Sequence, residues 1–157
     1  MEKKQFALGA KGLILIKTVE GCSLNAYRDV KGVPTIGYGH TFKVKMGDKI
    51  TQQQADELLA QDLDHFENGV NDLLDELNVT VTQNQFDALV SFAFNVGLGA
   101  LKRSTLCKKL YLMNQRDQAS IYAVADQFLR WVYAGKKKIK GLQNRRNKER
   151  LLFLGVV

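Results

Sequence analysis

The sequence contains little proline, cysteine or histidine. Of its 157 residues, one is proline, two are cysteine and two are histidine. Because proline interrupts helices, its scarcity favours a mainly helical chain. Cys22 and Cys107 form no CxxC pair, and His40 and His65 complete no zinc-binding pattern. We therefore predict two free, partly buried thiols, no metal and no cofactor, although the spacing leaves a disulfide open.

Long apolar segments are also missing from the beginning of the sequence. The longest apolar run in MEKKQFALGAKGLILIKTVEG is Leu13 to Ile16, far shorter than the roughly 20 residues that span a membrane. No small-residue cleavage site follows a suitable apolar stretch. We therefore expect no stable membrane insertion and no signal-directed export.

Basic residues outnumber acidic ones, with 23 Lys and Arg against 16 Asp and Glu. The composition is 45% apolar and 25% charged, which is typical of a soluble globular protein and excludes a disordered chain. A basic protein favours polyanions, so nucleic acid, an anionic membrane and a bacterial wall polymer all fit. A merely solubilising surface fits equally well.

The pattern of apolar residues predicts helices with clear ends. Leu13 to Val19 form a short apolar helix that Gly21 ends as a left-handed cap, so Glu20 is its last residue. Thr51 and Gln54 form a capping box that opens one long amphipathic helix reaching about Asn78. Further helices are predicted from Thr82 to Gly97 and Gly99, from Ser104 to about Met113, over 116–133, and from Leu142 to Leu154, with GKKKIKG as a basic loop.

The stretch EGCSLNAYRDVKGVPTIGYGH, residues 20–40, predicts two short strands around a tight turn. A three-residue loop at Lys31 to Val33 would place Asp29 directly opposite Thr35, with side chains about 5 Å apart. A two-residue turn would move Thr35 to the other face. Together with the helices, this hairpin predicts an α+β, mainly helical fold.

Two carboxylates in this region suggest a hydrolytic site. Asp29 beside Thr35 could hold a water molecule between a carboxylate and a hydroxyl group, as a general base requires. Glu20 at the end of an apolar helix is predicted to be partly desolvated, which favours its protonated, acidic form. An acid and a base are the minimum needed to cleave a glycosidic bond. An Asp that only forms a turn and a Thr that only suits a strand are the simpler alternatives.

The spacing E-x8-D-x5-T, here Glu20, Asp29 and Thr35, resembles that of phage-type lysozymes, the endolysins of glycoside hydrolase family 24. The blocks FDALVSFAFNVG, RSTLCKKL, FLRWVYAGKK and GLQNRRNKER follow in the order found in that family. The resemblance implies one two-lobed lysozyme domain over 1–157. It assigns about 21–60 to an N-terminal lobe with a small antiparallel sheet, about 51–78 to a connecting helix, and about 79–157 plus the first helix to a helical lobe.

The same resemblance implies an enzyme that hydrolyses the β-1,4 bond between N-acetylmuramic acid and N-acetylglucosamine in peptidoglycan. Glu20 would be the general acid, while Asp29 and Thr35 would hold the water. The place for this water favours inversion. Further residues with implied roles are Phe94, Asn95, Thr41, Ser104 and Thr105 as substrate contacts, Arg146 or alternatively Arg145 near Glu20, and His40 paired with Asp62 as a structural support.

The resemblance implies peptidoglycan as the binding partner and a monomeric protein. It also implies that a holin-type pore releases this monomer from the host cytoplasm. Some exported relatives use a cysteine near the glutamate as a disulfide switch, but we interpret Cys22 as a packing residue. Two alternatives are a lytic transglycosylase, which needs no Asp-Thr water site, and a non-enzymatic polyanion-binding protein. Nucleic acid is disfavoured because the basic residues are spread over several helices without an aromatic-basic motif.

Overall fold

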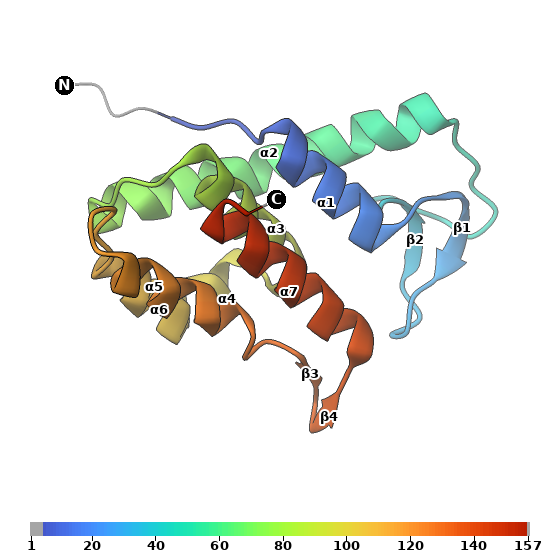
Figure 1. Ribbon diagram of the computed structural model, residues 1–157. Helices are drawn as coiled ribbons and strands as arrows, with labels where there is room; N and C mark the ends of the chain where they lie inside the picture. Colours follow the sequence, from blue (N-terminus) through green and yellow to red (C-terminus); the bar gives the residue numbers. More distant parts are fainter. Residues whose placement is uncertain (1–4, 157) are drawn as a thin grey trace. The chain divides into compact units, whose positions relative to one another are not determined.

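The computed structural model describes residues 5–156, and these form seven helices and four short strands (Figure 1). These residues divide into two compact units, one formed by Ile16–His65 and the other by residues 5–15 and 66–156. The predicted mainly helical α+β class with a small antiparallel sheet is confirmed. In chain order the elements are α1 (Ala10–Glu20), β1 (Ser23–Arg28), β2 (Pro34–Gly37), α2 (Gln52–Leu77), α3 (Gln83–Val96), α4 (Leu98–Arg103), α5 (Thr105–Tyr111), α6 (Gln118–Phe128), β3 (Tyr133–Ala134), β4 (Lys137–Lys138) and α7 (Lys140–Leu154).

The unit Ile16–His65 is built on the hairpin of β1 and β2. The loop after the hairpin adds to the outer edge of β1, because Ala26 N–H donates to Asp48 O at 2.9 Å and Ile50 N–H donates to Leu24 O at 2.9 Å. Ile36 of β2 and Leu59 of α2 are each 2% exposed and belong to the core. The hairpin is therefore held by the strand ladder, by the loop and by apolar packing.

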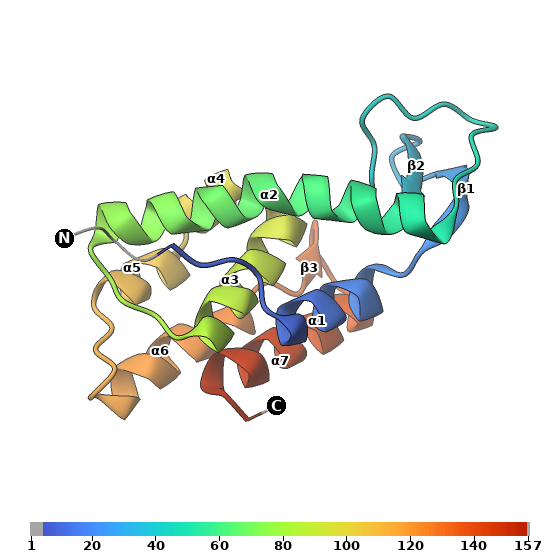
Figure 2. The same cartoon turned by 90° about the horizontal axis from the view of Figure 1, so that it is seen from above.

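Helix α2 is one continuous helix of 26 residues (Figure 2), about 39 Å long at 1.5 Å per residue. The predicted capping box is present, since Gln54 N–H donates to Thr51 Oγ1 at 3.1 Å and Thr51 N–H donates to Gln54 Oε1 at 2.9 Å. The helix ends as predicted, because Asn78 has a φ of 54° and leaves the helical region.

The second unit is centred on aromatic side chains from α3, α6 and α7. Helix α7 packs against both α3 and α6 (Figure 1). The ring of Phe128 lies 5.3 Å from that of Phe92 and 5.6 Å from that of Phe153. All three side chains are at most 2% exposed, so this cluster fixes α3 against α7.

Three predicted features of this unit are wrong. Helix α6 ends at Phe128, and the residues predicted to continue it or to form a basic loop instead make the hairpin of β3 and β4. Tertiary packing explains the early end, because Trp131 lies 5.2 Å from the ring of Phe92 and Val132 is buried. Gly99 does not end α3 but lies inside the unpredicted helix α4.

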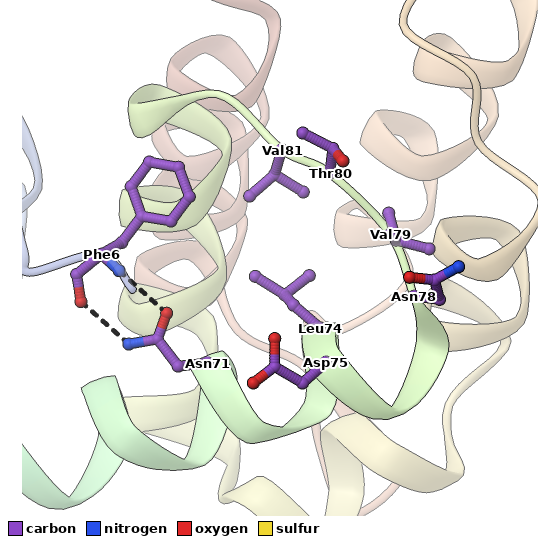
Figure 3. A pocket seen from close by; sticks show the side chains of 8 residues that line it. All are labelled: Phe6, Asn71, Leu74, Asp75, Asn78, Val79, Thr80 and Val81. Carbon is purple, nitrogen blue, oxygen red and sulfur yellow. Dashed lines mark hydrogen bonds between the residues drawn. The ribbon is translucent and has the colours of Figure 1, made fainter. Parts of the chain in front are cut away.

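The segment before α1 is tied to α2 and α3. Phe6 N–H donates to Asn71 Oδ1 at 3.0 Å and Asn71 Nδ2 donates to Phe6 O at 2.8 Å, next to a cavity of about 310 Å³ (Figure 3). Asp87 accepts from Gly9 N–H at 2.9 Å and Gly12 N–H at 3.2 Å. A carboxylate of α3 therefore caps the first turn of α1, where negative charge is stabilising.

Candidate active site

Glu20 is the last residue of α1, and Gly21 ends the helix with a φ of 68°, as predicted. The side chain of Glu20 is half-buried. Ile36 and His40 exchange two backbone hydrogen bonds of 2.9 Å and close a tight loop. Within this loop, Gly39 has a φ of 88°, and a Cβ built there would lie 3.5 Å from Glu20 Oε2. The glycine backbone thus borders the carboxylate.

The hairpin register differs from the prediction. Thr35 pairs with Tyr27 rather than with Asp29, and the loop consists of Val30 to Gly32 rather than Lys31 to Val33. Gly32 takes the positive φ of 81° that this turn needs. The error is two residues in the pairing, so it preserves the faces of the hairpin. Asp29 and Thr35 are therefore diagonal neighbours on one face, with Cα atoms roughly 7–8 Å apart.

Backbone groups of the turn orient both side chains. Asp29 Oδ1 accepts from Lys31 N–H at 2.8 Å and from Val33 N–H at 2.9 Å. Thr35 is 4% exposed, and its hydroxyl group donates to Val33 O at 2.8 Å. Among residues 5–156, no hydrogen bond is found to Asp29 Oδ2. Because the hydroxyl proton of Thr35 is donated to Val33 O, its Oγ1 can only accept a hydrogen bond from a further group. Asp29 Oδ2, a carboxylate oxygen, can likewise accept one.

The predicted pair of His40 and Asp62 is present. His40 Nδ1 lies 2.8 Å from Asp62 Oδ2, and Nε2 lies 3.0 Å from Phe42 O. His40 is 9% exposed. Both ring nitrogens face structural acceptors, so the geometry favours the supporting role over a role in proton transfer.

Replacing His40 by asparagine is expected to lower the free energy of unfolding by roughly 1–3 kcal/mol, because it removes a buried, charge-assisted hydrogen bond. The melting temperature should therefore fall clearly, whereas the rate of wall lysis by the folded protein should fall little. Thermal unfolding and turbidity assays measure the two effects, with His65→Asn on the exposed side of α2 as the control. A stable variant without activity would place His40 among the catalytic residues.

Phe94 and Asn95 lie on the last turn of α3. Phe94 is half-buried, and its ring meets that of Phe66 edge-on at 5.3 Å. Asn95 is exposed, and its Oδ1 accepts a hydrogen bond from Nη2 of the fully buried Arg146. A guanidinium group only donates hydrogen bonds. Asn95 must therefore turn its oxygen towards Arg146, which leaves its Nδ2 donors for another partner.

Arg145 and Arg146 belong to a buried network that sequence reasoning missed. Arg145 Nε lies 3.2 Å from Glu149 Oε2, and Arg146 Nε lies 3.1 Å from Glu149 Oε1. Ser91 Oγ donates to Glu149 Oε2 at 2.6 Å. Burial raises the pKa of Glu149, while the charges of Arg146 and Arg145 oppose this shift. The i, i+3 and i, i+4 spacing was the available signal. Contact of Arg146 with Glu20, in the other unit, stays a prediction.

The weaker substrate candidates separate by exposure. Ser104 is buried, and its hydroxyl group donates to Leu101 O at 2.6 Å and accepts from Cys107 N–H at 3.0 Å. It caps α5, which disfavours direct substrate contact. Thr41 and Thr105 are exposed, and their contact with substrate stays a prediction.

The thiols differ from one another. Cys22 is exposed, with Sγ 3.9 Å from Gln52 Oε1, so its interpretation as a packing residue is wrong. Cys107 is buried, and burial raises the pKa of its thiol. Within the described part of the chain both are free, and no group of three or more His, Cys, Asp or Glu side chains could hold a metal ion. No helix in this part is both long and apolar enough to cross a membrane.

The pattern of the Phage lysozyme family matches residues 17–149. The chain belongs to the phage lysozyme family. The endolysin of Salmonella phage P22 is 41% identical over 152 residues, which cover 94% of this chain and 97% of that protein. The structure of an endolysin from Escherichia coli O157:H7 phage FAHEc1 superposes with a TM-score of 0.83 at 37% identity, covering 99% of this chain and 98% of that one.

The endolysin of Bacillus phage B103 is 46% identical over 149 residues, covering 91% of this chain but 52% of that relative. The chain therefore spans about half the length of this Bacillus phage relative. The matching residues, 17–149, include Glu20, Asp29 and Thr35 as well as the two buried arginines.

Proposed function

We propose that the protein is a muramidase that hydrolyses the β-1,4 bond between N-acetylmuramic acid and N-acetylglucosamine in peptidoglycan. The observation that carries this proposal is the shared face of Asp29 and Thr35, with the hydroxyl proton of Thr35 bound to Val33 O. Membership of the phage lysozyme family supports it. Such a pair of acceptors suits a water molecule better than a substrate hydroxyl group.

The reaction begins with a water molecule that donates one hydrogen to Asp29 Oδ2 and the other to Thr35 Oγ1. Its lone pair then points towards the anomeric carbon. The water oxygen bonds to this carbon as the glycosidic bond breaks, Glu20 gives its proton to the leaving oxygen, and Asp29 takes the proton from water. One acid and one base acting through a water molecule give inversion at the anomeric carbon.

Residues at the end of α3 supply substrate contacts in this proposal. Asn95 can donate from Nδ2 to an acetamido carbonyl group, since Arg146 holds its Oδ1. Phe94 offers an apolar ring against a sugar face. Ser104 is left out of the contact set because its hydroxyl group already caps α5.

In the cell, we place the action of the protein at the bacterial wall. A holin-type pore would release a monomer that acts there. The relatives from phages P22 and B103 are endolysins, which supports a role in lysis.

Product analysis of digested peptidoglycan tests the reaction. NMR taken early in the digestion is expected to show the α-anomer, because direct attack by water inverts a β-linkage. A β-anomer would contradict inversion but leave hydrolysis standing. Mass spectrometry tests the transglycosylase alternative, since an anhydromuramyl end in place of a reducing end would contradict hydrolysis itself.

A further inference from the structure

We propose that the basic hairpin, residues Tyr133–Lys140 with β3 and β4, is a second contact for the peptidoglycan strand, outside the catalytic residues. Its lysines would bind carboxylates of the muramyl peptides, and Tyr133 would lie against a sugar face. This inference rests on the proposed function, because it takes the substrate polymer as the ligand.

Charge is unevenly distributed along the chain. Residues 50–101 contain nine Asp and Glu and no Lys or Arg, whereas residues 102–157 contain 14 Lys and Arg and three Asp and Glu. Each of these three acids already has a partner. Asp117 caps α6, Asp126 lies 2.9 Å from Arg150, and Glu149 is buried with two arginines. No Asp or Glu of residues 102–157 is therefore left to pair with the lysines of the basic hairpin.

Four lysines concentrate this surplus in the basic hairpin, at positions 136, 137, 138 and 140, and all are exposed. No ion pair of these lysines is found within residues 5–156. Lys140 is the first residue of α7, where the helix dipole disfavours a positive charge. No ion pair within the described residues therefore accounts for these charges, and they are available to an external anion.

Backbone pairing gives the basic hairpin a defined conformation. Tyr133 pairs with Lys138 and Ala134 with Lys137, and Gly135 turns the chain with a φ of 63°. At its base, Ile139 N–H donates to Val132 O at 2.9 Å, and Val132 is 5% exposed. Figure 1 shows the hairpin extending from α6 and α7 within its unit. Lys137 and Lys138 thus lie on an ordered ladder, with Lys136 in its turn and Lys140 at the start of α7.

The surface suits a carboxylate-bearing glycan. Tyr133 is 57% exposed and pairs with Lys138, so an aromatic side chain and a basic side chain leave the same face of the hairpin. A peptidoglycan strand repeats pyranose rings and peptide carboxylates along its length. Ring contact and charge contact could therefore form together on this polymer, which favours it over a partner that offers negative charge alone.

The test compares two triple variants that lose the same charge. The hairpin variant carries Lys136→Gln, Lys137→Gln and Lys138→Gln, and the control carries Lys102→Gln, Lys108→Gln and Lys109→Gln on exposed positions of α4 and α5. Both are made in a Glu20→Gln background, so that binding to purified sacculi stripped of phosphate polymers is measured without digestion. The hairpin variant should bind about tenfold more weakly at low salt, and the control less than twofold. The difference should shrink at high salt.

Tyr133→Ala should weaken sacculus binding about fivefold, which corresponds to the loss of one aromatic contact. With Glu20 restored, both triple variants should cleave a short soluble muramyl oligosaccharide as fast as the unmodified protein. Equal loss of sacculus binding in the two triple variants would overturn the proposal. So would a loss confined to walls that still carry phosphate polymers. Failure of the proposed function shows separately, because the unmodified protein would then not cleave the oligosaccharide.

Discussion

Replacing Glu20 by glutamine should abolish wall lysis while leaving the fold intact. Glutamine has nearly the same size but has no acidic proton for the leaving oxygen. Loss of general acid catalysis lowers rates by roughly 10²–10⁴, and the residual rate should fall below detection in a turbidity assay on purified peptidoglycan. Because Glu20 is half-buried at a helix end, its replacement should leave circular dichroism unchanged.

Glu57→Gln provides the matched control, since it removes the same charge from an exposed position of α2 in the same unit. This variant should lyse walls at the full rate. Full activity of Glu20→Gln would instead support the non-enzymatic polyanion-binding alternative, in which no side chain transfers a proton.

Asp29 needs a finer comparison because its carboxylate also stabilises the turn. Asparagine keeps an oxygen for Lys31 N–H and Val33 N–H but lacks the charge that accepts a proton. Asp29→Asn should therefore lose activity and keep stability, whereas Asp29→Ala should lose both. Equal stability of the two variants would show that the turn does not depend on this carboxylate.

The helices could be predicted because their ends carry local signals. The pairs Thr51 with Gln54 and Thr82 with Gln85 satisfy backbone donors within four residues, so each can be found without knowing the fold. Gly21 ends α1 for an equally local reason. The end of α6 at Phe128 could not be found in this way, since it depends on Trp131 packing against Phe92, a residue far away in the sequence.

The hairpin that carries Asp29 and Thr35 was predicted, but its register was not. Gly32 was the available signal, because a three-residue hairpin loop places its left-handed glycine last, which favours a loop that begins at Val30 over one that begins at Lys31. Hydrogen bonds from Lys31 N–H and Val33 N–H to Asp29 Oδ1 stabilise the same turn. The prediction that Asp29 and Thr35 share a face survived because the pairing moved by an even number of residues.

The buried arginines illustrate a different limit. Sequence reasoning placed Arg145 and Arg146 on the last helix and favoured Arg146 for the site. It could not see that Ser91, 58 residues before Glu149, completes the pairing. Arg145, Arg146 and Glu149 are buried because α3 packs against α7. The spacing of apolar residues along the sequence does not predict this packing.

Replacing Glu149 by alanine should lower the free energy of unfolding by roughly 3–5 kcal/mol. The change leaves Arg145 and Arg146, which are 5% and 0% exposed, without their shared carboxylate in a poorly solvated interior. Urea unfolding monitored by circular dichroism measures the loss. Asp126→Ala is the control, because it breaks the partly exposed pair with Arg150 and should cost less than about 1 kcal/mol.

Glutamine at position 149 separates charge from shape. It can keep a hydrogen bond with Ser91 while it removes the charge between the two guanidinium groups. If pairing of charge dominates, Glu149→Gln should cost nearly as much stability as Glu149→Ala. If filling of the space dominates, glutamine should recover most of the loss. We expect the first result, because a donor-only guanidinium group leaves its charge uncompensated beside a neutral amide. A glutamine variant as stable as the unmodified protein would contradict it.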